Sequence, residues 1–148
     1  MYITLETDYA VRITAELCRE QGKLDARTIS ERTGVTLRFS LKILRKLVSE
    51  GIVRSYKGTQ GGYMINMDPH EITLRTVVEA IEGTYCFSRC LSADGECNRG
   101  ASGYCRFQEA FAEITHMVRD KLDSFTFADL ITEKEDKEKA DERRIPEP

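Results

Sequence analysis

The feature that most limits how this chain can fold is a pair of helical patterns separated by a glycine. It begins at residue 26 with ARTISERTGVTLRFSLKILRKLVSEG. Thr28 and Glu31 stand three residues apart, which is the capping-box pattern found at the start of a helix. Gly34 interrupts the pattern, because glycine readily adopts the left-handed backbone that commonly ends a helix. We therefore expect a short helix that ends in a tight turn at Gly34.

The second helical pattern is longer and is followed by two strand-like segments. Thr36 is suited to cap this helix, and apolar residues recur along it every three or four positions, at Leu37, Leu41, Leu44 and Val48. After Gly51, the segments IVRSYK and GYMI are joined by GTQG, a pattern that predicts a β-hairpin. Helix, turn, longer helix and hairpin in this order predict a winged helix-turn-helix domain, which we place at residues 1–83.

The distribution of charge indicates a DNA partner for this domain, although the whole chain has a net charge of −3. Residues 25–62 hold eight positive and three negative side chains, and the difference is +5. Helix-turn-helix proteins place the second helix in the major groove. The candidate DNA-contacting residues are Thr28, Thr36, Arg38, Ser40, Lys42, Arg45, Lys57 and Gln60. A basic, solvated helix face is the alternative, and the agreement of turn, wing and charge favours DNA.

A heptad-like stripe in the C-terminal part predicts a long helix. The apolar residues there alternate at intervals of three and four, at Tyr104, Phe107, Phe111, Ile114 and Val118. Packing on its own domain is one interpretation. We favour a dimerisation helix within residues 104–132, because DNA-binding dimers read two half-sites. The charged tail, residues 133–148, is expected to be disordered or a frayed helix. The expected fold class is mostly α with a small β-hairpin wing.

Residues 84–106 form a polar loop that holds four of the five cysteines. The sequence has no signal-peptide pattern and no apolar run long enough to cross a membrane, so we expect a cytoplasmic protein without a membrane partner. In that reducing compartment, clustered cysteines indicate metal or redox chemistry more often than disulfides. Cys86 and Cys90 have the spacing of a zinc-binding pair. The wider intervals to Cys97 and Cys105 modestly favour an iron–sulfur cluster.

Two further observations concern the other functional residue types. Cys18 is far in sequence from the loop, and we expect it to be a small buried apolar side chain. His70 and His116 lie on different predicted elements, and the sequence has no nucleophile pattern, phosphate loop or acid pair. We therefore do not expect an enzyme.

From Met1 to about Thr132 the chain resembles the IscR/NsrR-type family of bacterial winged-helix regulators. The resemblance rests on ISERTGVTLRFSLKILRKLVSEGIVRSYKGTQGGYMI, the ITL…V…AIEG helix, three cysteines in one loop and SFTFADLI near the end. It implies a dimeric DNA-binding repressor or activator. Many members carry an iron–sulfur cluster in this loop and respond to iron–sulfur status, iron, nitric oxide or redox stress.

The resemblance also implies a ligand set for a cluster, of the 2Fe-2S or the 4Fe-4S type. The three family cysteines fall on Cys90, Cys97 and Cys105. IscR-like members add a histidine where this chain has Gln108, whereas NsrR-like members add an aspartate of the partner subunit, which corresponds to Asp8. Cys86 is an alternative fourth ligand. The function expected is cluster-controlled operator binding by a homodimer. The alternative is a cluster-free regulator with a thiol switch or a structural zinc.

Overall fold

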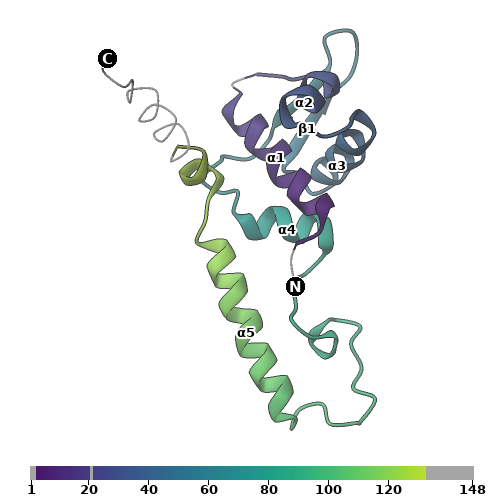
Figure 1. Ribbon diagram of the computed structural model, residues 1–148, viewed down its shortest axis with the longest axis vertical. Helices are drawn as coiled ribbons and strands as arrows, with labels where there is room; N and C mark the ends of the chain where they lie inside the picture. Colours follow the sequence, from purple (N-terminus) through teal and green to yellow (C-terminus); the bar gives the residue numbers. More distant parts are fainter. Residues whose placement is uncertain (1–2, 21, 133–148) are drawn as a thin grey trace, which may run out of the picture.

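The computed structural model describes residues 3–20 and 22–132 (Figure 1). The helices and strands in chain order are α1 (Leu5–Arg19), α2 (Ala26–Thr33), α3 (Leu37–Ser49), β1 (Val53–Tyr56), β2 (Gly62–Ile65), α4 (Leu74–Glu82), the 3-10 helix η1 (Arg89–Leu91) and α5 (Arg106–Asp123). The fold is mostly helical with a two-stranded hairpin, which confirms the expected class. None of the helices in these ranges is long and apolar enough to cross a membrane. The predicted tail, residues 133–148, lies outside the described residues.

A single apolar core holds the N-terminal helices together. Ile13 of α1, Ile29 of α2 and Leu44 of α3 are fully buried and belong to this core. Full burial of each such side chain contributes about 1.5–3 kcal/mol to stability. Phe127 joins the core from beyond α5, and its backbone N–H donates to the carbonyl of Ile72 over 2.8 Å. The end of the described chain is therefore packed against the winged-helix domain.

The caps of α2 and α3 agree with the sequence in part. Asp25 caps α2, since its carboxylate accepts from the backbone N–H groups of Arg27 and Thr28. The predicted capping box at Thr28 is therefore wrong, because the aspartate three residues earlier starts the helix first. Gly34 ends α2 with a left-handed φ of 68°, and the Thr36 side chain caps α3. Both of these predictions are confirmed.

The buried face of α3 is rotated from the predicted one. The buried residues of this helix are Ser40, Ile43, Leu44 and Leu47, so Leu44 alone of the four predicted positions is buried. Leu37 is 39% exposed. Two adjacent apolar stripes exist in this sequence, and the spacing pattern alone does not distinguish them. The consequence is that α3 presents Leu37 as well as its basic residues at the surface.

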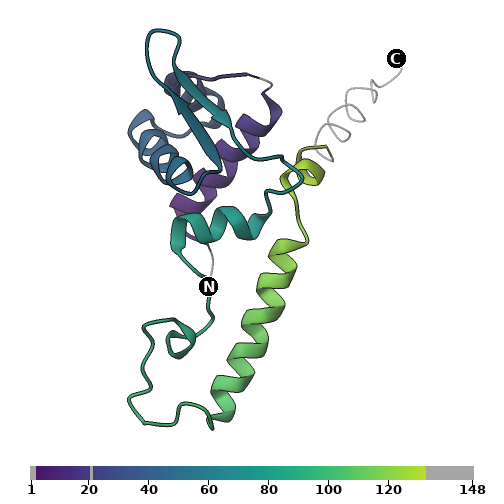
Figure 2. The same ribbon diagram turned by 180° about the vertical axis from the view of Figure 1, so that it is seen from behind.

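The wing is held against the turn between α1 and α2. β1 and β2 pair antiparallel from Val53↔Ile65 to Tyr56↔Gly62, and Figure 2 shows the hairpin loop protruding from the domain. Leu24 exchanges two backbone hydrogen bonds with Tyr63, of 2.9 and 2.8 Å. At Gly62, φ is +153° and an added Cβ would lie 2.7 Å from the Leu24 carbonyl oxygen. A glycine is required here because the two backbones approach so closely.

The long helix α5 extends from the winged-helix domain like an arm, with residues 84–105 running beside its lower half (Figures 1 and 2). Its upper end is joined to α4 by ion pairs, since Glu79 accepts from Arg119 at 3.0 Å and Asp123 from Arg75 at 2.6 Å. Farther down, the rings of Phe87 and Phe111 stack with centroids 5.5 Å apart. The cysteine loop is thus attached mainly at its start and to one face of α5.

Candidate DNA-binding surface and cysteine loop

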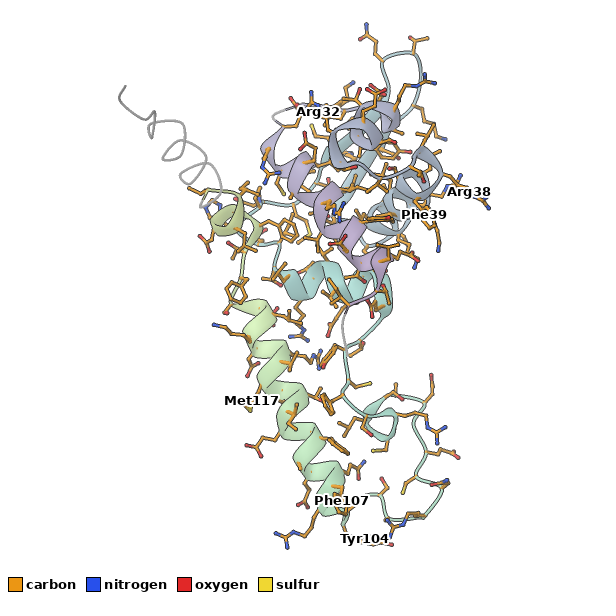
Figure 3. The ribbon with its side chains drawn as sticks, viewed as in Figure 1. Arg32, Arg38, Phe39, Tyr104, Phe107 and Met117 are labelled. Atoms are coloured by element: carbon orange, nitrogen blue, oxygen red, sulfur yellow. The ribbon has the colours of Figure 1, made fainter. Side chains whose placement is uncertain are left out.

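The exposed side of α3, together with its N-cap residue, carries four of the eight residues predicted to contact DNA. Thr36, Arg38, Lys42 and Arg45 are all exposed. The last three lie at intervals of four and three residues, so they share one helix face. Figure 3 shows Arg38 projecting from α3 into solvent. The face opposite the core is therefore a row of cations that begins at the N-terminal end of the helix.

Two predicted contact residues form hydrogen bonds within the domain. Ser40 is fully buried, and its hydroxyl donates to the carbonyl of Val35 over 3.3 Å. The prediction that Ser40 contacts DNA does not fit this position, because its side chain faces the core and closes the turn between α2 and α3. The hydroxyl of Thr28 donates to the Asp25 carboxylate over 2.7 Å. Thr28 therefore supports the start of α2.

Lys42 shares an acidic partner with its neighbour on the helix. Its ammonium group lies 2.8 Å from Glu6 Oε2, and that of Lys46 lies 2.8 Å from Glu6 Oε1. Both ammonium groups lower the pKa of the Glu6 carboxyl, and the hydrogen bond from Lys42 has the larger effect. No local sequence pattern indicates this bridge, because Glu6 lies on α1, 36 residues before Lys42.

The wing adds a second group of cations. Lys57 and Gln60, the predicted contact residues of the wing, are exposed in the loop between β1 and β2. Lys23 donates to the Gln60 carbonyl over 2.9 Å and lies 5.0 Å from the centre of the Tyr56 ring. Arg54 lies 5.8 Å from the same ring. The sequence pattern did not single out Lys23, because it reaches the wing only through the Leu24–Tyr63 pairing.

The four cysteines of the loop are free thiols, each half-buried. Cys90 lies in η1, with its sulfur 3.2 Å from the Ser88 hydroxyl. Cys97 lies in an irregular segment, and Cys105 is the residue before α5. No three His, Cys, Asp or Glu side chains in residues 3–20 and 22–132 come together as a group that could hold a metal ion. The predicted cysteine ligands are therefore in one loop, but no three of them are gathered.

The environment of Cys97 favours its thiolate. Its sulfur accepts the backbone N–H of Ala101 over 3.4 Å. Backbone donation from Ala101 and Arg99 lowers the pKa of the Cys97 thiol, because such hydrogen bonds stabilise the charged form. Asp8, by contrast, pairs with Arg12 of the same helix at 2.6 Å. Asp8 does not lie with the cysteines of its own chain.

Gln108 connects the two sides of the cysteine loop. Its side-chain amide donates to the Cys90 carbonyl over 3.2 Å and accepts from the Gly103 N–H over 3.4 Å. This is the position at which the resemblance placed a histidine in other proteins. Gln108 thus has a structural role that its position in the sequence did not reveal.

Cys86 and His116 line a hollow of about 460 Å³ between the loop and α5.

The predicted heptad stripe of α5 lies across two environments. Phe111 and Val118 are half-buried, and Phe111 stacks on the chain's own Phe87. Phe107 is 73% exposed, and Met117, which is outside the predicted stripe, is 64% exposed. Figure 3 shows Met117 on the side of α5 that faces away from the cysteine loop. One edge of the stripe packs within the chain, and the other edge is an unpartnered apolar surface among the described residues.

The family model "Rrf2: Iron-dependent Transcriptional regulator" matches residues 3–133 of this chain. The chain belongs to the Rrf2 family. It is therefore a DNA-binding transcriptional regulator and not an enzyme. The Rrf2 match spans the winged helix, the cysteine loop and α5 together.

Individual relatives agree with this Rrf2 assignment. The chain is 29% identical over 147 residues, 98% of this chain and 86% of the relative, to the HTH-type transcriptional regulator IscR of Vibrio parahaemolyticus. The solved structure of T. potens IscR superposes with a TM-score of 0.70 at 20% identity, covering 100% of this chain and 94% of that one. The global cysteine regulator CymR of B. subtilis gives a TM-score of 0.69 at 23% identity, covering 89% and 97%. These two structures support the fold.

Proposed function

We propose that this Rrf2-family regulator is a homodimer whose affinity for operator DNA is controlled by an iron–sulfur cluster held in the cysteine loop. The observation that carries the proposal is that four free thiols lie in one loop with almost no core of its own. In a family described as iron-dependent regulators, a thiol-rich loop that lacks apolar support is suited to be organised by a ligand. A thiolate-held cluster also requires a reducing compartment, which the cytoplasm provides.

The donor chemistry of the loop fits an iron–sulfur cluster, because thiolates are its usual ligands. Cys90, Cys97 and Cys105 would hold the cluster, with Cys86 or Asp8 of the partner subunit as the fourth ligand. The cluster would supply a redox- and nitric-oxide-sensitive iron centre. Since the thiols are apart, binding requires the loop to rearrange, which its few internal contacts permit. The number of iron atoms in the purified protein distinguishes the 2Fe-2S type from the 4Fe-4S type.

The exposed apolar edge of α5 supports the homodimer. Phe107, Ile114 and Met117 are exposed along this helix, and monomers seldom leave such an aromatic and aliphatic row uncovered. A two-fold pairing of α5 helices would present two α3 helices to DNA. Such dimers bind half-sites spaced by a helical turn or a multiple of it. We therefore expect an operator with two-fold symmetry.

The chain's own residues couple the loop to the DNA-binding surface. The loop begins directly after α4, and Glu79 and Arg75 of α4 hold the upper end of α5 through Arg119 and Asp123. A change in the loop would shift α4 and α5 together relative to the partner's copies. Cluster state and operator affinity are coupled only as far as the cluster prefers one dimer geometry.

The decisive experiment is anaerobic purification with iron and acid-labile sulfide counts, followed by operator binding with and without the cluster. We expect brown protein that loses its visible absorbance in Cys97→Ala and keeps it in the control Cys18→Ala, which changes a thiol on α1. Operator affinity should differ between the two states. Zinc without sulfide would support a structural metal, and metal-free protein with reversible thiol oxidation would support a thiol switch. Either result contradicts the cluster.

Dimerisation is tested separately by analytical ultracentrifugation. Met117→Glu places a charge on the exposed apolar edge and should shift the protein toward monomer. His116→Glu, next to it in sequence but at the hollow lined by Cys86, is the matched control and should leave the dimer intact. Equal dissociation of both variants, or of neither, would argue against pairing through this edge.

A further inference from the structure

The N-terminal turn of α1 places one carboxylate between two lysines of the DNA-binding helix. Glu6 lies 2.8 Å from the ammonium group of Lys42 and 2.8 Å from that of Lys46. Each of its two oxygens serves one lysine. Two positive charges and one negative charge leave a net charge of +1 at this part of α3. One of the two positive charges of this lysine pair is therefore neutralised within the protein.

Glu6 is held in place by the structure around it. Its side chain is only 21% exposed. The start of α1 is fixed by Glu82, the last residue of α4, whose carboxylate accepts from the backbone N–H and the hydroxyl of Thr4 and from the hydroxyl of Thr7. Lys46 also donates to the Ile81 carbonyl over 3.2 Å. The Glu6 carboxylate is thus held beside α3 by the contacts between α1 and α4.

The two lysines differ in their access to solvent. Lys42 is 55% exposed and lies on the same face of α3 as Arg38, whereas Lys46 is 38% exposed and has a second acceptor in α4. A free lysine is a point charge on a flexible stem and follows any nearby phosphate. To contact DNA, Lys42 must instead give up its ion pair with Glu6. Replacing that ion pair is favourable only where a DNA acceptor lies within reach of the lysine in the complex.

We propose that Glu6 is a specificity-determining positioning residue of the DNA-binding surface. It restrains Lys42, so that the lysine increases the affinity for the operator and not that for random DNA. This inference rests on the proposed operator binding but not on the cluster. Removing the carboxylate frees a cation that any duplex can engage. Because each added phosphate contact steepens the dependence of binding on salt by about one unit on logarithmic axes, the effect has a signature beyond a change in affinity.

The test uses the full-length protein, an operator duplex obtained by in vitro selection and a scrambled duplex of equal length, with binding followed by fluorescence anisotropy over a salt series. Glu6→Gln should bind scrambled DNA more tightly, lower the operator preference by about five-fold or more, and steepen the salt slope by about one per subunit. The charge-matched control Glu31→Gln, on the exposed side of α2, should leave slope and preference close to those of the wild type.

The double variant Glu6→Gln/Lys42→Ala distinguishes a freed lysine from altered folding. The steeper slope should disappear in this background, because the freed cation is gone. If Glu6→Gln matches Glu31→Gln in slope and preference, or if the steep slope persists without Lys42, the inference is wrong. If the wild-type protein prefers no sequence after selection, the proposed operator binding itself fails. A thermal unfolding curve for each variant shows that the compared proteins are folded.

Discussion

The winged-helix domain and the cysteine loop are organised by different forces. The domain's core includes fully buried side chains from α1, α2, α3 and α4, with Phe127 added from the end of the described chain. In residues 84–106, all of which the structure describes, Ala101 alone is buried. The loop's internal backbone bonds close local turns, such as those from Leu91 to Ser88 and from Gly95 to Ser92. The winged-helix domain has a core, whereas the cysteine loop has only local turns and contacts along α5.

This difference in packing means that the winged-helix domain is ordered by its own core, whereas the cysteine loop has no such support. Ordering one residue's backbone costs about 1–2 kcal/mol, and burial of apolar surface is the main term that offsets this cost. The winged helix meets the requirement by itself, so its DNA-binding face is preformed. The loop does not bury enough apolar surface, so its shape is open to control by whatever its thiols bind. The proposed sensing role would benefit from this property, whereas a recognition helix would lose specificity by it.

The largest expected effect compares a leucine from each region. Leu44→Ala, in the core, should lower the free energy of unfolding by about 3 kcal/mol, through lost burial and the cavity left behind. Leu91→Ala, half-buried in the loop, should lower it by less than about 1 kcal/mol in metal-free protein. Urea denaturation followed by far-UV circular dichroism measures both. A similar cost for the two substitutions would mean that the loop has a core of its own.

A smaller effect tests how the wing is attached. Gly62→Ala would bring a Cβ to 2.7 Å from the Leu24 carbonyl oxygen at a φ of +153°, and such strain costs about 2 kcal/mol. Gly22→Ala is the control, because an added Cβ there would meet no atom within 4 Å. The same denaturation experiment should show a loss for the first variant and almost none for the second. Equal stability would indicate that the wing is free of the α1–α2 turn.

The fold was predictable because its determinants are local. Gly34 and Thr36 mark their turn and cap by residue type alone, and the hairpin follows from two short apolar segments around GTQG. The rotation of α3 was not predictable, since Leu41 lies in one apolar stripe and Ile43 and Leu47 lie in the adjacent one, and the choice depends on the packing partner. The start of α2 was misplaced because Asp25 outcompetes Thr28 for the cap.

The candidate site was predictable only in its residue types. The sequence gathers four cysteines and a row of cations, and the structure places the cations of α3 on one face. It does not gather the thiols, because the spacing of cysteines along a polar loop does not determine whether their side chains converge. Glu6, Lys23 and Gln108 were missed for another reason. Each acts on residues far away in sequence through tertiary contacts that no local pattern records.

The smallest expected effect extends the comparison to single thiols, one in each region. Cys18, on α1, is partly buried, and burial raises the pKa of its thiol to about 11, whereas backbone donation from Ala101 lowers the pKa of Cys97. The thiolate is the reactive form. In metal-free protein, the pH midpoint for alkylation of Cys97 by iodoacetamide should therefore lie below that of a cysteine model peptide, and that of Cys18 well above it. Peptide mass spectrometry follows each site.

Removing the donor sharpens this test. Ala101→Pro lacks the backbone N–H, so the Cys97 midpoint should rise toward that of the model peptide, while Ala101→Gly keeps the N–H and should retain the lower midpoint. A Cys97 midpoint that does not respond to Ala101→Pro would show that this hydrogen bond does not persist in solution. The loop would then lack the local order that favours one thiolate before any ligand arrives, and its contrast with the winged-helix domain would be greater still.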